Sequence, residues 1–137
     1  MERISAGIFV LFASLFIVSV LYAGDAEAGE KILKLRCASC HTTAEGGANK
    51  IGPNLWGVMS RPPATQEGFS YSNGMLKAVE GMEDRWDLEE LDEFLNNPTQ
   101  FLFDRNDGPR IPRSRMIMQL RRQNDRRDVI AILKTLN

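Results

Sequence analysis

The order of apolar and polar residues divides the chain into an apolar N-terminal run and a longer remainder with short amphipathic stretches. The run extends from Ile4 to Tyr22 almost without interruption and follows the short start Met1-Glu2-Arg3. Such a run is typical of an export signal. We expect residues 1–23 to be a signal peptide cleaved near Ala23. The alternative is an uncleaved membrane anchor, because the run is longer than a usual signal core.

Residues 24–137 are expected to form a single domain that begins with helical segments. Residues 25–38 start with acidic side chains, which the positive N-terminal end of a helix dipole favours. A short helix is expected near 73–79. A clearer one is expected at 87–96, where leucines recur at i, i+3 and i+7 and Pro98 ends the pattern.

The other segments, 42–74 and 99–115, are rich in turn-forming residues and have no sustained period, so we expect them to be irregular. A closing helix, capped by Asn124 or Asp125, has as its apolar side Val129, Ile132, Leu133 and Leu136. No strand alternation is seen, which predicts an all-α domain with long loops. Such loops offer few apolar contacts to offset their ordering entropy, and a large apolar cofactor would supply them.

The charges nearly cancel, but they are segregated along the chain. The formal net charge is −1, which implies neither a nucleic acid nor a generally acidic surface as a partner. Residues 80–93 hold eight acidic side chains against Arg85 alone, whereas residues 105–127 hold eight arginines against Asp107 and Asp125. We therefore expect a strong molecular dipole.

The two cysteines and the single histidine are consecutive in one short motif, Cys37-Ala38-Ser39-Cys40-His41. A disulfide here would close a very short loop and add little stability. Zinc would need two further Cys or His ligands, which the sequence lacks. A dithiol catalyst would need a surrounding βαβ pattern, which is also absent from the sequence. The motif is that of covalent haem attachment. We expect one haem c, bound through Cys37 and Cys40, with His41 as an iron ligand.

The iron needs a second axial ligand, and His41 is the only histidine. Methionine sulfur is a common choice that raises the reduction potential. Of the six methionines, Met116 follows a polar, proline-containing approach at residues 111–115, an unusual setting for a core residue. We expect Met116 to be the ligand, with Met118 as its near competitor and the others as core residues.

On these residues the chain resembles the class I c-type cytochromes of mitochondria and bacteria, over essentially all of residues 24–137. The resemblance implies a small all-α cytochrome c fold, in which several short helices and long loops wrap around one covalently bound haem. The stretch Gly52-Pro53-Asn54-Leu55 resembles the family loop whose proline carbonyl orients the ligand histidine. The resemblance further implies that four residues bind the haem propionates or their water: Arg61, Tyr71, Trp86 and Ser114.

The chain departs from the family pattern on the methionine side of the haem. Its segments from Tyr71 to Trp86 and from Pro98 to Met116 are longer than usual. Phe94 stands where the family often has a tyrosine that bonds near the methionine sulfur. Gly29 and Leu33 resemble the family's first helix, but their expected contact with the closing helix lacks the usual aromatic residues.

The resemblance implies a monomeric electron carrier and not an enzyme. Its partners would be a donor similar to quinol–cytochrome c reductase and a terminal oxidase or reductase as acceptor. It would work in the periplasm, or at the periplasmic face of the inner membrane if residues 1–23 are retained. Two alternatives remain open: a haem enzyme or gas or peroxide sensor with a labile Met116, and a tethered electron-transfer subunit of one oxidase or dehydrogenase. A docking ring for partners is expected from Arg113, Arg115, Arg121 and Arg122.

Overall fold

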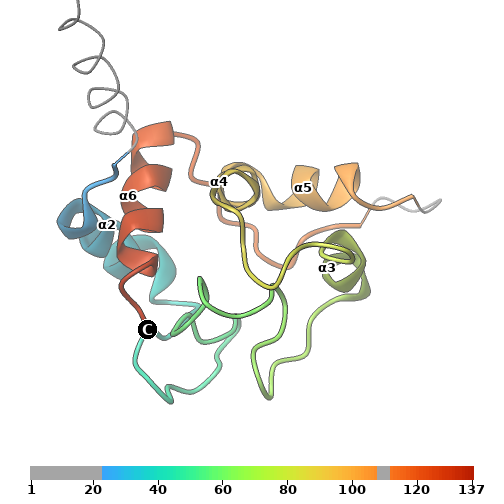
Figure 1. Ribbon diagram of the computed structural model, residues 1–137, viewed down its shortest axis with the longest axis horizontal. Coiled ribbons are helices and arrows are strands. Elements are labelled where there is room, and N and C mark those ends of the chain that lie inside the picture. The colour runs from blue at the N-terminus through green and yellow to red at the C-terminus, as the bar shows by residue number, and fades with distance from the viewer. Residues whose placement is uncertain (1–22, 108–111) are drawn as a thin grey trace, which may run out of the picture.

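The computed structural model describes residues 23–107 and 112–137, so the expected signal peptide or anchor lies almost entirely outside the described residues. The described part contains helices and connecting loops and no strand, which confirms the all-α expectation. None of its helices is both long enough and apolar enough to cross a membrane. The helices, drawn in Figure 1, are α2 (Ala26–Ile32), a π-helical turn η1 (Leu33–Cys37), α3 (Asn73–Ala78), α4 (Leu88–Asn96), α5 (Pro98–Asp104) and α6 (Gln123–Leu133).

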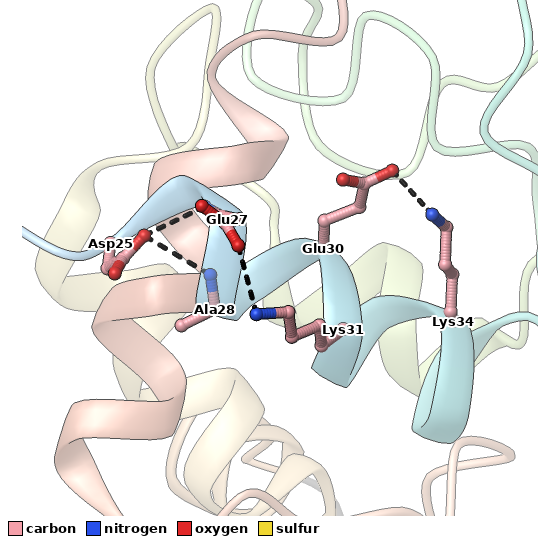
Figure 2. A network of polar contacts seen from close by, with 6 residues as sticks. All are labelled: Asp25, Glu27, Ala28, Glu30, Lys31 and Lys34. Atoms are coloured by element: carbon pink, nitrogen blue, oxygen red, sulfur yellow. Dashed lines mark hydrogen bonds and ion pairs between the residues drawn. The ribbon is translucent and has the colours of Figure 1, made fainter.

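The first helix begins at a strong cap. The Asp25 carboxylate accepts hydrogen bonds from the backbone N–H groups of Glu27 and Ala28, at 2.9 and 3.2 Å. Two exposed ion pairs, Glu27–Lys31 and Glu30–Lys34, lie one turn apart along its surface, as Figure 2 shows, and contribute little. The helix then widens into η1, whose last residue, Cys37, is buried. The predicted helix over residues 25–38 is confirmed, with this change of hydrogen bonding in its second half.

Helices α2 and α6 lie side by side (Figure 1). A Cβ atom on Gly29 would lie 2.0 Å from the carbonyl oxygen of Asp128 and 3.0 Å from the Ile132 side chain. Only glycine allows the two backbones to approach this closely. The Asp128 carboxylate also accepts a hydrogen bond from the backbone N–H of Asp25, at 2.8 Å. The expected contact between the first and the closing helix is therefore confirmed.

Helix α4 begins and ends as the sequence predicts, but the residues that follow it form a helix that the sequence did not predict. Asp87 and Glu90 form a reciprocal capping box at its start, and Leu91 and Leu95 are buried. Pro98 then begins a new helix, α5, for which Asn97 is the N-cap. The expectation of irregular structure over 99–115 was wrong for residues 99–104. A proline loses no hydrogen bond at the first position of a helix, so it can end one helix and start the next.

The expected cap of the closing helix was also wrong. Arg122 occupies the N-cap position of α6 and makes no side-chain capping bond there. Asp125 lies in the first turn, where its negative charge interacts favourably with the helix dipole. It is 3.7 Å from the Arg122 guanidinium. The predicted apolar side does face inward: Val129 and Leu133 are buried, and Ile132 and Leu136 pack at the edge of the core. The helix is thus held by packing and not by its cap.

Candidate cofactor site

The helices and the loop over residues 38–72 surround one apolar cavity of about 350 Å³. Its apolar lining comes from η1, α3, α4, α5 and α6. All nine residues that the sequence analysis singled out line it: Cys37, Cys40, His41, Pro53, Arg61, Tyr71, Trp86, Ser114 and Met116. Positions up to 79 residues apart in the chain therefore converge on a single site.

The two thiols and the imidazole enter the cavity from the end of η1. Backbone hydrogen bonds from Cys40 and His41 to the Cys37 carbonyl, at 3.0 and 2.9 Å, continue the helical turn. This turn places Cys37, Cys40 and His41 on one cavity wall. Both thiols are free, and burial raises the pKa of Cys37, which keeps it a neutral thiol.

His41 is fixed by the loop that follows it. Its Nδ1 atom hydrogen-bonds to the carbonyl oxygen of Pro53, at 2.7 Å, which is the contact that the family resemblance implied. A Cβ atom on Gly52 would lie 2.3 Å from the ring carbon Cε1, so the loop passes directly against the imidazole. Burial lowers the pKa of His41 and favours the neutral ring, the form that binds metals. With Nδ1 used by Pro53, Nε2 remains for a metal.

Arg61 and Tyr71 supply the polar part of one wall. The Arg61 guanidinium donates to the carbonyl oxygen of Asn54, at 2.8 Å, and to that of Trp56. Burial lowers the pKa of Arg61 and raises that of Tyr71. The Tyr71 hydroxyl accepts a hydrogen bond from the backbone N–H of Gln66, at 3.2 Å. Both side chains are thus anchored to the loop beneath the cavity, with their polar ends near one another.

Trp86 completes the lining from beside α4. It is 6% exposed and stacks with Phe94 and Phe101, with ring centroids 5.4 and 5.8 Å away. Phe94 also lines the cavity. Phe94 therefore presents an apolar ring to the cavity.

Residues 112–120, here called the methionine segment, also line the cavity. Exposure alternates along it: Met116 and Met118 are partly buried, while Ile117 between them is 89% exposed, and all three border the cavity. The backbone N–H of Met116 donates to the hydroxyl of Ser114, at 3.1 Å, and that of Leu120 donates to the Leu95 carbonyl, at 2.8 Å. The Ser114 hydroxyl keeps its own proton available for a further partner.

The sequence analysis did not place Asn54 or Met75 in the cofactor site. Asn54 is 3% exposed, and its amide donates to Thr42 and Ala44 while its oxygen accepts from the backbone N–H of Trp56. It therefore shapes the loop that carries Pro53 and anchors Arg61. Met75, expected in the core, lines the cavity from α3. Nothing in the local sequence marks either residue, except that Asn54 follows Pro53.

The donor set fits a large, flat, apolar cofactor carried by two thiol linkages. Two free thiols and an oriented imidazole face one apolar cavity, which the methionine segment also lines. Within the described ranges, no three His, Cys, Asp or Glu side chains are grouped so as to hold a metal ion by themselves. A porphyrin would supply the remaining iron ligands.

Comparison with known proteins identifies the family. A family model for cytochrome c matches residues 26–137. Cytochrome c-550 of Novispirillum itersonii is 40% identical over 113 residues, which are 82% of this chain and 99% of that protein. Cytochrome c2 of Rhodospirillum rubrum is 37% identical over 136 residues, which are 97% of this chain and 96% of that protein.

A solved structure has the same fold. The X-ray structure of cytochrome c2 from Rhodobacter sphaeroides superposes with a TM-score of 0.71 at 30% identity, covering 82% of this chain and 96% of that one. The cavity with its thiols and imidazole, the matched family model and these relatives agree. The chain belongs to the cytochrome c family and is a class I c-type cytochrome.

Proposed function

We propose that this single-haem electron carrier binds iron through His41 and Met116 and holds the porphyrin through Cys37 and Cys40. Like the family, it carries one covalently attached haem c, whose iron supplies one-electron chemistry by changing between its ferrous and ferric states. The observation that carries the proposal is the convergence of all nine predicted residues on one apolar cavity.

Each protein group has a defined task in this proposal. The Pro53 carbonyl fixes the His41 ring through Nδ1, which would leave Nε2 to bind the iron. The methionine segment presents a soft, uncharged sulfur from the other side, which favours a high reduction potential. If His41 and Met116 both bind the iron, they would leave no position for a substrate. This arrangement favours a carrier over an enzyme or a gas sensor.

The polar groups of the cavity are proposed to bind the two haem propionates or their water. Arg61 supplies a positive charge and Tyr71 a hydroxyl on the same wall. The Trp86 indole N–H and the Ser114 hydroxyl can donate from the other elements. A carboxylate buried with an arginine and several donors costs less than one left unpaired.

The proposed partners are a donor similar to quinol–cytochrome c reductase and an acceptor oxidase or reductase. The four arginines of the docking ring, Arg113, Arg115, Arg121 and Arg122, are all exposed, and Arg115 also lines the cavity. Positive charges beside the cavity would orient it toward an acidic partner surface. We place the protein in the periplasm after cleavage of residues 1–23, or at the periplasmic face of the inner membrane if they are kept.

The ferric absorption spectrum tests the ligand assignment. The parent protein is expected to show the weak methionine–iron charge-transfer band at the red edge of the visible spectrum. Met116→Ala should abolish this band and lower the reduction potential by on the order of 0.1 V or more, within the ~0.8 V that axial ligands span.

Met118→Ala is the matched control, because Met118 lines the same cavity two residues further on. It should keep the band. Loss of the band in Met118→Ala alone would show that Met116 is not the ligand. A high-spin parent spectrum with rapid carbon monoxide binding would favour the sensor or enzyme alternative.

A further inference from the structure

One side chain joins the end of α5 to the start of α3. Asn106 follows the last turn of α5, and its amide nitrogen donates to the carbonyl oxygens of Leu102, at 2.6 Å, and Gly74, at 3.1 Å. Leu102 belongs to α5 and Gly74 to the first turn of α3. Both hydrogen bonds are partly buried. Two short helices, each too short to be stable alone, are thereby held together.

The methionine segment begins against the same glycine. A Cβ atom on Gly74 would lie 2.7 Å from the Cβ atom of Pro112 and 3.5 Å from the Leu102 side chain. Pro112 therefore rests on the backbone that Asn106 holds. The chain leaves this junction at Asn106 and returns to it at Pro112, four residues before Met116.

The other hydrogen bonds that hold the methionine segment before Met116 are weaker than those of Asn106. Arg115 donates to the Ser70 carbonyl at 2.9 Å, but this bond is exposed to water. The backbone N–H of Ser114 reaches the Thr99 hydroxyl at 3.4 Å, near the limit of a hydrogen bond. Among the attachments seen in the described residues, the partly buried junction of Asn106, Gly74 and Pro112 is thus the firmest support for the start of the methionine segment.

We propose that Asn106 is a positioning residue for the Met116 ligand. Its two hydrogen bonds stabilise the state in which Met116 lies against the cavity. They do not stabilise a state in which the methionine segment has moved away. Asn106 therefore lowers the fraction of molecules with an open axial position. This inference rests on the proposed ligation of iron by Met116.

Imidazole binding to the ferric holoprotein measures that fraction. Added imidazole must displace Met116, so its apparent affinity rises in proportion to the open fraction. Asn106→Asp keeps the size of the side chain, removes both donated bonds and places carboxylate oxygens against two carbonyls. We expect the apparent imidazole affinity to rise roughly tenfold, about the effect of losing one to two ordinary hydrogen bonds.

The matched control is Gln100→Ala. Gln100 lies on the same helix and donates a side-chain hydrogen bond, at 2.7 Å, but to exposed Asp104 and not to α3. Its removal should leave imidazole affinity unchanged. A role for Asn106 in general stability alone would lower resistance to denaturant in Asn106→Asp without changing the imidazole affinity, and that result would overturn the proposal.

Gly74→Ala tests the same junction from its other side, including the case in which Asn106→Asp gives no holoprotein. Alanine favours the α3 helix, but its Cβ atom would displace Pro112. We expect a higher imidazole affinity here too. An unchanged affinity in Gly74→Ala and in Asn106→Asp, with the charge-transfer band present in the parent, would refute the role of the junction.

A double-mutant comparison separates this inference from the proposed ligation. In a Met116→Ala background there is no methionine to displace, so Asn106→Asp should no longer change imidazole affinity. A rise that persists in this background would mean that Asn106 controls access to the cavity and not the ligand. A parent without the band, whose imidazole affinity is unaffected by Met116→Ala, would refute the ligation and with it this inference.

Discussion

At the scale of single residues, the His41 ring is constrained on two sides. The Pro53 carbonyl fixes the rotation of the ring through Nδ1, and the Gly52 backbone lies flat against it. The hydrogen bond from Gly52 to the Cys40 carbonyl, at 2.8 Å, ties this loop back to the attachment motif. The orientation of the proposed ligand His41 is therefore fixed through backbone groups of the Pro53 loop.

Gly52→Ala tests this constraint. The added methyl group would overlap the His41 ring and push it away from the Pro53 carbonyl. Loss of such an orienting contact typically weakens a metal site by 10- to 100-fold, so we expect the yield of covalent holoprotein to fall by about tenfold. The yield is measured by the pyridine haemochrome assay.

Gly46→Asn is the control for Gly52→Ala. Gly46 lies in the same loop at φ +64°, with no atom within 4 Å of its missing side chain, and asparagine tolerates this conformation. Its holoprotein yield should stay near that of the parent. Equal yields for the two variants would mean that the close approach of Gly52 does not position the ring.

Residues in local motifs were predictable from the sequence, whereas those with distant backbone partners were not. Cys37, Cys40 and His41 stand in a motif whose spacing has one main chemical use. Asn54 and Asn106 act by donating to carbonyl groups, which every residue possesses, so no partner can be recognised in the sequence. Only the fold shows that these two amides are partly or fully buried.

At the scale of the elements, Arg126 joins α6, α4 and the end of the methionine segment. It is 7% exposed, and its Nε atom donates to the Asp92 carboxylate at 2.8 Å. Its guanidinium also donates to the carbonyl oxygens of Leu120 and Arg121, both at 2.9 Å. Although it stands among exposed arginines in the sequence, Arg126 is part of the core.

Arg126→Leu should destabilise the holoprotein strongly. The substitution leaves the Asp92 carboxylate and two carbonyl groups without their partner in a mostly buried place. Removing one member of such a pair costs about 3 kcal/mol, and the free energy of unfolding should fall by that amount. Guanidinium titration followed by helical circular dichroism measures it.

Arg122→Leu is the matched control on the same helix end. Its side chain is 81% exposed and 3.7 Å from Asp125, so its loss should cost less than about 1 kcal/mol. If the two variants had similar stability, the Arg126 network would add nothing to holding α4 and α6 together.

The helices that could be predicted are those whose start and stop signals in the sequence allow only one interpretation. Helix α4 carries a capping box and a regular leucine pattern, and both are found in the structure. Helix α5 was missed because Pro98 is equally suited to ending a helix and to starting one. Residues 98–104 form a helix because Phe101 and Leu102 are buried against the rest of the core, and this packing cannot be read from the local sequence.

At the scale of the whole molecule, opposite charges gather on different elements. The acidic side chains are concentrated on residues 80–93, which include most of α4, and the arginines between residues 105 and 127. Two of these arginines, Arg105 and Arg126, form ion pairs with Glu93 and Asp92, so the separation rests on the exposed arginines of the docking ring. The net charge of −1 gives little overall attraction to any partner. The direction of the dipole, and not the net charge, would then orient the molecule as it approaches another protein.

This charge separation predicts a salt-dependent reaction with a redox partner. Replacing Arg113 and Arg115 by glutamine removes two exposed charges beside the cavity. At low ionic strength, the association rate with the proposed donor, an enzyme similar to quinol–cytochrome c reductase, should fall by about tenfold in stopped-flow reduction, since electrostatic steering acts mainly on encounter. At about 0.5 M salt the parent and the variant should react alike. Arg85→Gln, within the acidic region, should not slow the reaction. A parent that reacts equally fast at high and low salt would exclude docking by these arginines.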